Sequence, residues 1–549
     1  MSDLKGNTLG LKPSQKKNLL KLFQRRVPAD RVLSPDLARA LTEASLDIGR
    51  QVGLLVDRRG GVLDIFIGDA KGIVISELGR FRVGKSRFRG VRFVHTHLDD
   101  EPLTRDDLTD LALLRFDMMV AVQVLPSGLP GSVHLAWLHP ETPGGDPWHV
   151  EPPVSIHDLD LDFAGFLTSL EQEFATVTRA SRQVDGRTRR GILVGVTRGR
   201  LEDLQQSMAE LRELADSAGI EVVEVVTQRR KDLNPRYVVG SGKLKELMIT
   251  ALQKGADLIV FEGELSGSQM RAISELGELE VIDRTQLILD IFARRAHSRD
   301  GKLQVELAQM KYSLPRLVLK DDFLSRLTGG IGARGPGETK IEVLRRRVKD
   351  RIARLEKELD QISKQRRLRR SQRTRSGIPV VNLVGYTNAG KSTLLRTLTG
   401  AEVLVEHRMF ATLDPTSRRL RLPSGREVVL TDTVGFIQDL PDDLARAFRA
   451  TLEELNDADL LVHMVDVSNP GYPDQILAVQ EILEDLALDA IPQILILNKV
   501  DRVAPEILEN ALATWEGAVP VSALKPATLA PFLEAVEAFL GEGAKAQAG

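Results

Sequence analysis

The sequence contains no cysteine among its 549 residues, which excludes disulfide bonds, iron–sulfur clusters and thiolate zinc sites. Net charge is nearly absent as well, because 75 Lys and Arg stand against 77 Asp and Glu. A nucleic-acid partner would therefore have to meet a local basic patch. Long apolar runs are also lacking, since the most apolar stretches, 458–467 and 492–497, have the length of strands rather than of membrane spans. A reducing compartment, the cytoplasm, is the natural expectation.

The rest of the composition is that of ordinary globular domains. Hydrophobic residues make up 42% of the chain and charged residues 28%, which excludes wholesale disorder. At about 150 residues per domain, the length predicts three or four domains. Breaks in pattern predict a multidomain α/β protein with an N-terminal α+β extension, a smaller α/β domain, a helical segment, a second α/β domain and a tail: 1–190, 191–300, 301–376, 377–541 and 542–549.

The extension mixes strand and helix patterns. Residues 51–57 and 62–67 predict two strands joined by a turn, and 111–124 reads as a helix running into a strand. Residues 140–153 are rich in Pro and Gly and predict a loop, whereas the basic stretch 179–190 predicts a linker.

The next segment alternates strands and helices, which predicts a small, mostly parallel α/β sheet. We expect strands at 191–196, 221–226, 256–263 and 280–283, and helices at 201–218, 242–254 and 266–276.

Two long helices are predicted after this domain. The first runs from about 287 to 325 with a break at Pro315, and a Gly-rich loop, 329–338, leads into the second. Apolar residues of the second helix step by three and four, as in a coiled-coil seam: Ile341, Leu344, Val348, Ile352, Leu355, Leu359 and Ile362. Two such helices joined by a loop predict a long antiparallel helical hairpin.

The last domain contains the strongest chemical signal, a phosphate-binding loop (P-loop). A buried-type strand, 378–384, runs into the loop, and a helix, 392–398, follows it. The glycines let backbone N–H groups point at phosphates beside a helix N-terminus. We expect Lys391 to reach the terminal phosphates and the Ser392 hydroxyl to hold Mg²⁺. The loop comprises Gly385, Tyr386, Thr387, Asn388, Ala389, Gly390, Lys391 and Ser392.

Three further motifs follow strands of the same domain and predict a site for GTP and GDP. Asp432 would hold a metal-bound water, the Gly435 amide would meet a γ-phosphate, and Asp501 would accept guanine N1–H and the exocyclic amine. Adenine lacks those donors and would leave the carboxylate unpaired. The motifs are Asp432, Thr433, Val434 and Gly435; Asn498, Lys499, Val500 and Asp501; and Ser522, Ala523 and Leu524.

A polar loop between the first two motifs predicts the segment that senses the nucleotide: Phe410, Ala411, Thr412, Leu413 and Asp414. Thr412 is the candidate for the second hydroxyl on Mg²⁺, ordered only when a γ-phosphate is present, and Thr416 is the alternative. The predicted catalytic residues are Lys391, Thr412 and Gly435, which would stabilise charge and order the γ-phosphate.

Two residues depart from the common GTPase pattern. Phe436 stands where many GTPases carry the Gln that positions the attacking water, so unaided hydrolysis should be slow. The side-chain oxygen of Asn388 could ligate K⁺ beside the phosphates, supplying the charge that an arginine finger otherwise provides.

Together these motifs resemble the HflX family of ribosome-associated GTPases, in the translation-factor-related class. The likeness rests on GYTNAGKST, FATLDPT, DTVGF and NKVD, and outside this domain on QVELAQMKYSLPRL, GGIGARGPGETKIE and YVVGSGKLKEL. It spans 191–541 and implies a ribosome-stimulated GTPase that binds the large subunit and splits or rescues stalled ribosomes under stress. The alternative is a nucleotide-dependent ribosome- or RNA-binding protein with negligible hydrolysis.

The resemblance also implies where partners bind. The hairpin would reach rRNA, and the basic residues of 364–375, together with those of the preceding helix, agree with RNA contact, a solvated helix face being the alternative. ATP would bind near Gly240, Ser241, Gly242 and Lys243, although a plain helix N-cap at Ser241 explains that turn equally well. We expect a cytoplasmic monomer that associates with ribosomes, or peripherally with a membrane. The basic residues of the helix are Arg345, Arg346, Arg347, Lys349, Arg351 and Arg354.

A separate candidate lies in the extension, where His95, His97, Thr104 and Asp107 resemble the metal-binding run of JAMM/MPN proteins, in which two His and an Asp hold zinc. Leu98 replaces the usual Pro and the spacing is one residue short, so we expect a degenerate fold used for binding rather than a hydrolase. An isolated His-x-His pair at a strand end is the plainer alternative.

Overall fold

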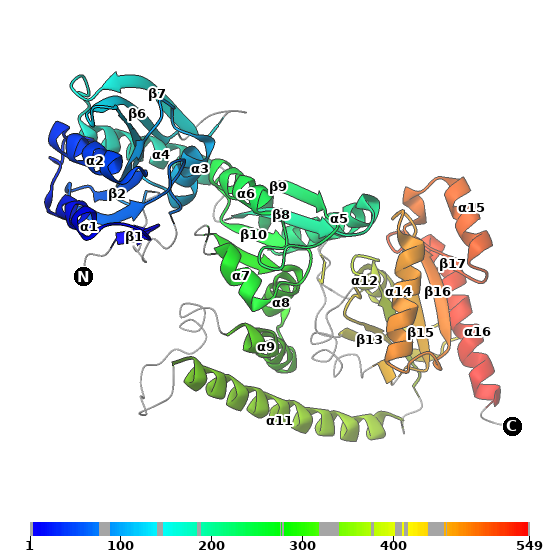
Figure 1. Ribbon diagram of the computed structural model, residues 1–549. Coiled ribbons are helices and arrows are strands. Elements are labelled where there is room, and N and C mark those ends of the chain that lie inside the picture. Colours follow the sequence, from blue (N-terminus) through cyan, green and yellow to red (C-terminus); the bar gives the residue numbers. More distant parts are fainter. Residues whose placement is uncertain are drawn as a thin grey trace. The chain divides into compact units, whose positions relative to one another are not determined.

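The computed structural model contains three sheets with helices packed around them (Figure 1). The chain divides into two compact units: 1–192, 231–259 and 272–280 form the first, and 193–230, 260–271 and 281–549 form the second. Within the described chain, no helix combines the length and apolarity needed to cross a membrane. The residues described are 4–75, 88–139, 146–183, 188–274, 276, 279–317, 340–374, 378–400, 409–410, 416–437, 455–456 and 458–546.

The first unit is built on a seven-stranded mixed sheet in the order β1-β3-β2-β4-β5-β6-β7. The pairs β1–β3 and β4–β5 are parallel and the other neighbours are antiparallel, which confirms the predicted α+β extension. The strands are β1 (Leu4–Gly6), β2 (Val52–Asp57), β3 (Val62–Ile67), β4 (Val91–His97), β5 (Met118–Val124), β6 (Pro130–Leu138) and β7 (Trp148–Ser155).

Helices cover both faces of this sheet, because alternate residues of its central strands point to opposite sides. On one face Val94 packs in a core with α1 (Pro13–Leu20) and α2 (Pro35–Ile48). On the other face Phe93 packs in a second core with α3 (Arg105–Leu114). A longer helix, α4 (Phe163–Gln183), contributes apolar side chains to both cores.

Two predictions in the extension were wrong. The predicted loop 140–153 overlaps β7, which begins at Trp148. This strand lies at the edge of the sheet, where Pro residues are tolerated because they need not donate to a ladder. The predicted linker 179–190 is helical as far as Gln183 and enters a strand at Arg189. Arg and Gln are good helix formers, so basic charge alone did not end the helix.

The four-stranded sheet, in the order β11-β10-β8-β9, confirms the predicted alternation of strands and helices. Its strands are β8 (Arg189–Thr197), β9 (Ile220–Arg229), β10 (Leu258–Phe261) and β11 (Glu280–Asp283). Its helices are α5 (Leu201–Ser217), α6 (Ser241–Gln253) and α7 (Gly267–Ser274).

The first long helix is interrupted once more than predicted. It comprises α8 (Arg284–Arg295) and α9 (Arg299–Ser313), because the Ser298 hydroxyl caps α9 by accepting from the Gly301 N–H at 2.9 Å. The second helix, α11 (Lys340–Thr374), packs on α9 through the predicted seam, with Leu355 fully buried. The Gly-rich loop 329–338 lies outside the described residues.

The six-stranded sheet of the second unit has the order β13-β14-β12-β15-β16-β17 and is parallel except at β13–β14. Parallel pairing places the carboxyl ends of β12, β14, β15 and β16 at one edge, where ligands bind in open α/β sheets. The strands are β12 (Val380–Gly385), β13 (Thr416–Arg421), β14 (Glu427–Asp432), β15 (Leu460–Asp466), β16 (Gln493–Asn498) and β17 (Val519–Pro520). The helices include α12 (Lys391–Thr399), α14 (Tyr472–Asp485), α15 (Pro505–Thr514) and α16 (Ala530–Ala546).

His463, in the middle of β15, makes the stability of this unit sensitive to acid. Its side chain is 2% exposed, and burial together with the nearby Lys391 charge lowers its pKa from 6.5 to about 4. The unfolded state therefore binds the extra proton between these two values, so stability falls as pH falls through that window.

We expect His463→Leu to remove this penalty. Between about pH 7 and pH 5 the wild-type protein should lose ~2 kcal/mol of stability that the variant retains. Hydrogen exchange of the β15 amides, compared for the two proteins at each pH, measures the difference. The exposed His157, replaced in the same way, is the control; a constant gap between wild type and His463→Leu at every pH would contradict the assignment.

Candidate nucleotide-binding site

The P-loop links the end of β12 to the start of α12 through a tight backbone curl. Gly385 has φ 143° and Gly390 has φ 104°, conformations that L side chains rarely adopt. A Cβ on Gly385 would lie 2.2 Å from the Met464 carbonyl oxygen, and one on Gly390 would lie 2.3 Å from Asn498 Nδ2. Both glycines are therefore required by the close approach of neighbouring strands.

Lys391, the first residue of α12, folds its side chain back into this curl. Its Nζ donates to the carbonyl oxygens of Gly385 and Tyr386, at 2.8 Å each, and the residue is 6% exposed. Burial lowers its pKa to about 8, although the Asp432 carboxylate acts in the opposite direction. The loop thus holds the ammonium group among its own backbone groups, where a phosphate-loop lysine contacts phosphate oxygens.

The residues predicted to face Mg²⁺ come together only in part within the described chain. The Ser392 hydroxyl donates to Asp432 Oδ2 at 2.6 Å, which places two hard oxygen donors side by side at the end of β14. Mg²⁺ prefers such oxygen ligands, so this donor set fits the ion. Thr412 lies outside the described residues, while the alternative, Thr416, begins β13 opposite Asp432.

The segment after β14 runs against the P-loop as a short extension of the sheet. The Thr387 N–H donates to the Phe436 carbonyl at 2.8 Å, and the Phe436 N–H donates to the Gly385 carbonyl at 3.1 Å. Gly435 is required here, because a Cβ would lie 2.8 Å from Thr387 Cα. The Phe436 ring is 4% exposed in the core with Leu461, so it anchors this segment and offers nothing to an attacking water.

The side chain of Asn498 links the P-loop to the last of the guanine-recognition motifs. Asn498 donates from Nδ2 to the Ala389 carbonyl at 2.7 Å and accepts at Oδ1 from the Ala523 N–H at 2.9 Å. The Asp501 side chain is exposed, and the neighbouring Ser522 side chain lowers its pKa, which favours the ionised form. An ionised, accessible carboxylate is what recognition of two guanine donors requires. Of the third motif, Leu524 is 57% exposed.

One contact at this edge was missed by sequence analysis. Lys499 Nζ lies 2.6 Å from Asp466 Oδ2, so the carboxylate that ends β15 orients the base-recognition loop. Its position immediately after a buried strand, like that of Asp432, was the available signal.

Within the second unit, the P-loop also contacts α5. The Tyr386 hydroxyl donates to Glu210 Oε1 at 2.8 Å, and Arg284 Nη2 donates to Glu210 Oε2 at 2.7 Å. Glu210 is thus held between a nucleotide-loop residue and the start of α8.

The described part of the nucleotide-sensing loop reaches the same helices. The Met409 N–H donates to Ser217 Oγ at 2.8 Å, and the Phe410 ring packs edge-on against Phe292 with centroids 4.5 Å apart. Phe410 has a positive φ of 55°, so the chain turns sharply there. Ala411, Leu413 and Asp414, like Thr412, lie outside the described residues.

The predicted ATP site near Gly240 stays a prediction, but its alternative explanation was wrong in detail. Helix α6 begins at Ser241 itself, and its N-cap residue is Gly240 without a side-chain capping bond. Ser241 therefore does not cap the helix. Lys243 pairs with Glu246 at 3.1 Å on the same helix.

A parallel sheet, a phosphate loop with its buried lysine, a hydroxyl–carboxylate pair and a guanine-type carboxylate define a P-loop GTPase. Three family models match the chain: "GTP-binding GTPase N-terminal" at 205–293, "GTP-binding GTPase Middle Region" at 295–373 and "50S ribosome-binding GTPase" at 380–499. Curated relatives are similar over a large part of the chain. GTPase HflX of Caldanaerobacter subterraneus is 50% identical over 333 residues, or 61% of this chain and 77% of the relative. GTPase HflX of Escherichia coli is 46% identical over 303 residues, or 55% and 70%.

The chain therefore belongs to the HflX family of GTPases. It is a GTP-hydrolysing enzyme, which favours the first of the two predicted functions over a binding protein with negligible hydrolysis.

Replacing Asp501 tests the base assignment. In Asp501→Asn the amide would oppose the guanine amine and match a xanthine oxygen, so the preference for GTP over XTP should fall on the order of 10²-fold or more. Titration with fluorescent GTP and XTP analogues measures both affinities. Asp489→Asn, an exposed change away from the site, is the matched control. Unchanged guanine preference in Asp501→Asn would remove Asp501 from the site.

Proposed function

We propose that this GTPase binds the large ribosomal subunit and uses GTP hydrolysis in the splitting or rescue of stalled ribosomes. The observation that carries the proposal is that one unit holds both a guanine-nucleotide site and a long helix with several exposed basic residues. The matched family model, which is described as a 50S ribosome-binding GTPase, supports the same partner.

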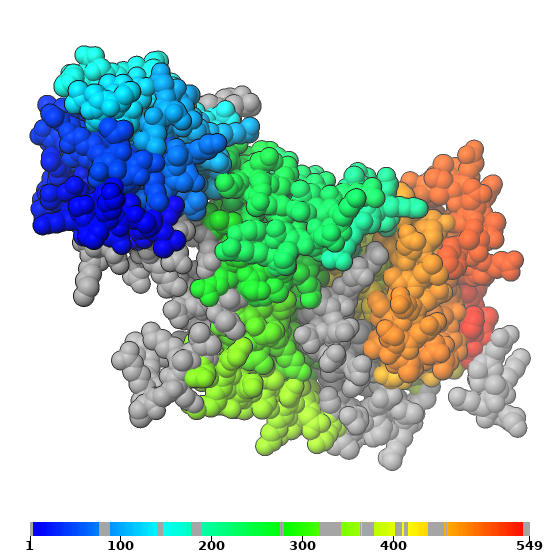
Figure 2. Space-filling model, in the orientation of Figure 1, coloured from blue at the N-terminus to red at the C-terminus, as the bar shows by residue number. Residues whose placement is uncertain are grey.

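These exposed basic residues lie on the N-terminal half of α11, on more than one side of the helix. Arg345, Arg347, Lys349 and Arg354 are exposed there, and the yellow-green helix is open on the face seen in Figure 2. Exposed cations on one helix suit the phosphates of RNA, because each neutralised phosphate releases counterions. Arg351 is different, since it forms two bonds to Glu306 of α9, at 2.8 and 2.9 Å, and so helps to hold the helix pair together.

The contacts around Glu210 and Ser217 provide a route from nucleotide to helices. GTP would order the Gly435 and Thr412 segments, and its hydrolysis would release them. The P-loop, against which the Gly435 segment runs, contacts α5 through Tyr386, and the residue Met409, shortly before Thr412, contacts it directly. A change in either segment would therefore alter how the nucleotide domain is held against the rest of its unit.

In hydrolysis, the P-loop amides and Lys391 would stabilise charge on the phosphates, and the Gly435 amide would meet the γ-phosphate. Ser392 and Thr412 would hold Mg²⁺, which when bound neutralises phosphate charge, and Asp432 would hold a metal-bound water. The buried Phe436 leaves the water to be oriented by a backbone group or by the ribosome. The unaided rate should therefore be low, and the bound ribosome should raise it.

This dependence is directly measurable. Phosphate release from GTP should rise at least tenfold on addition of large subunits. Binding of subunits is tested separately with a triple variant, Arg345→Ala, Arg347→Ala, Lys349→Ala. Its plot of log affinity against log salt concentration should be shallower by roughly 0.7–0.9 per lost phosphate contact. The exposed Lys16, Lys17 and Lys21 of the first unit, changed together to Ala, are the matched control. Equal hydrolysis with and without subunits would contradict the proposed partner.

We also propose that K⁺ binds beside the exposed Asn388, which has a positive φ of 63° within the P-loop. A potassium ion there would add the positive charge that an arginine finger supplies in other GTPases. GTP turnover should then be several-fold faster in KCl than in NaCl at equal ionic strength, and Asn388→Ala should abolish the difference. Identical rates in the two salts would remove potassium from the mechanism.

A further inference from the structure

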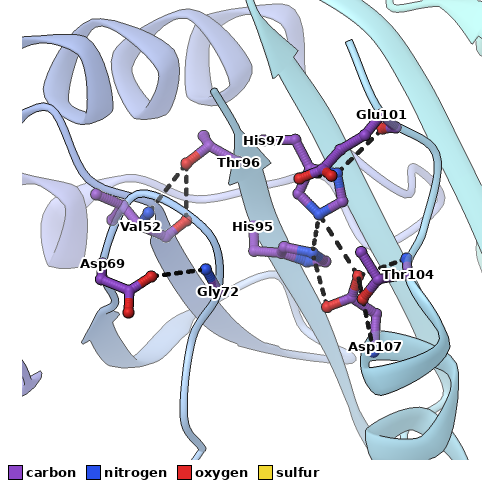
Figure 3. A network of polar contacts seen from close by, with 9 residues as sticks. All are labelled: Val52, Asp69, Gly72, His95, Thr96, His97, Glu101, Thr104 and Asp107. Carbon is purple, nitrogen blue, oxygen red and sulfur yellow. Dashed lines mark hydrogen bonds and ion pairs between the residues drawn. The ribbon is translucent and has the colours of Figure 1, made fainter. Parts of the chain in front are cut away.

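A cluster of potential metal ligands lies in the first unit and has no role in nucleotide binding. His95 and His97 stand two residues apart on β4, so both point to the same face of the sheet, toward α3. Asp107 comes from the first turn of α3. Figure 3 shows the two imidazoles and the carboxylate converging on one point.

The distances within this cluster match those of a metal coordination shell. His95 Nε2 lies 2.9 Å from His97 Nε2 and 3.3 Å from Asp107 Oδ1, and His97 Nε2 lies 3.5 Å from Asp107 Oδ2. A tetrahedral Zn²⁺ with bonds of 2.0–2.1 Å would separate its ligand atoms by about 3.3 Å. The three side chains therefore already stand at the spacing that zinc imposes.

The hydrogen bonds around His97 orient it as a ligand. Its Nδ1 lies 3.1 Å from the Glu101 carbonyl oxygen, which can only accept, so Nδ1 carries the proton. In the neutral ring Nε2 then presents a lone pair to His95 and Asp107. A histidine whose outer nitrogen donates to a backbone carbonyl is the usual arrangement of a metal-bound imidazole.

Asp107 is held in place independently of the histidines. Its Oδ2 accepts from the Thr104 N–H at 2.8 Å and from the Thr104 hydroxyl at 2.7 Å, as part of the capping box of α3. Oδ1 remains directed at His95. Because His95 is 1% exposed and His97 1% exposed, water cannot solvate the acceptors that face one another there.

The two acceptors that face His95 compete for a single hydrogen atom. The His97 lone pair and the Asp107 carboxylate both face His95 Nε2, which can supply one hydrogen to only one of them. Buried polar atoms without a partner are costly, and a cation at the centre would satisfy all three groups at once.

We propose that His95, His97 and Asp107 bind one Zn²⁺ ion in the N-terminal extension. Three protein ligands leave the fourth position to water or to an outside ligand, as in zinc sites that are not purely structural. The Asp107 side chain is 21% exposed, so solvent reaches the cluster on the side of the carboxylate. Nitrogen and oxygen donors without thiolate are well suited to zinc, and the chain contains no cysteine.

The test uses the full-length protein, stripped with a chelator and titrated with zinc sulfate in competition with a fluorescent zinc indicator. We expect one equivalent of zinc per chain by elemental analysis, lost in His97→Ala and in the nearly isosteric Asp107→Asn. Co²⁺ in place of zinc should give the intense visible absorption of a four-coordinate site in the wild-type protein and not in Asp107→Asn.

His149→Ala, at an exposed histidine on β7, is the matched control and should retain the full equivalent. Circular dichroism of Asp107→Asn separates loss of metal from loss of fold. The proposal is overturned if the wild-type protein takes up less than a tenth of an equivalent, or if folded His97→Ala and Asp107→Asn bind as much zinc as the wild type. Either result would mean that a protonated imidazole, rather than a metal, satisfies the cluster.

Discussion

The nucleotide site depends on the side-chain amide of Asn498, which links three loops that are far apart in the sequence. Its Nδ2 group donates to the P-loop at Ala389, and its Oδ1 accepts from the third motif at Ala523. The amide is 1% exposed, so neither bond competes with water. Since Asn498 ends β16, the same strand that sets its position also delivers Asp501 to the guanine. The positions of the P-loop and of the base-recognition residues therefore both depend on Asn498.

Close packing at the phosphate end places a buried phenyl ring where many GTPases carry a glutamine. Gly435 touches the P-loop backbone, and the next side chain, Phe436, is driven into the core between β12 and α14. A buried phenyl ring stabilises the segment by removing apolar area from water. The same burial removes the position from which a polar side chain would orient water. Stability of the switch segment and the proposed dependence on an external activator therefore have one cause.

The histidine cluster of the first unit and the nucleotide site of the second are built from the same kinds of element. Polar side chains at the carboxyl end of a central strand meet the first turn of a helix. In one unit this arrangement suits phosphate and a hard cation, because it provides amides, a hydroxyl and carboxylates. In the other it suits zinc, because it provides two imidazoles and one carboxylate. Side-chain chemistry, rather than fold class, distinguishes the two sites.

Local patterns in the sequence were enough to predict most strands and helices and the P-loop between β12 and α12, and they nominate Asp501 for guanine recognition. Such features depend on residues close in the chain, whose spacing directly sets backbone curl or helix face. Three features depended on tertiary structure: the role of Pro-containing 148–153 as an edge strand, the burial of Phe436 and the convergence of His97 with Asp107. The first two are decided by which strands become neighbours, and the third by how α3 packs against β4. Strand pairing brings together residues far apart in sequence, and no local spacing encodes the distances between their side chains.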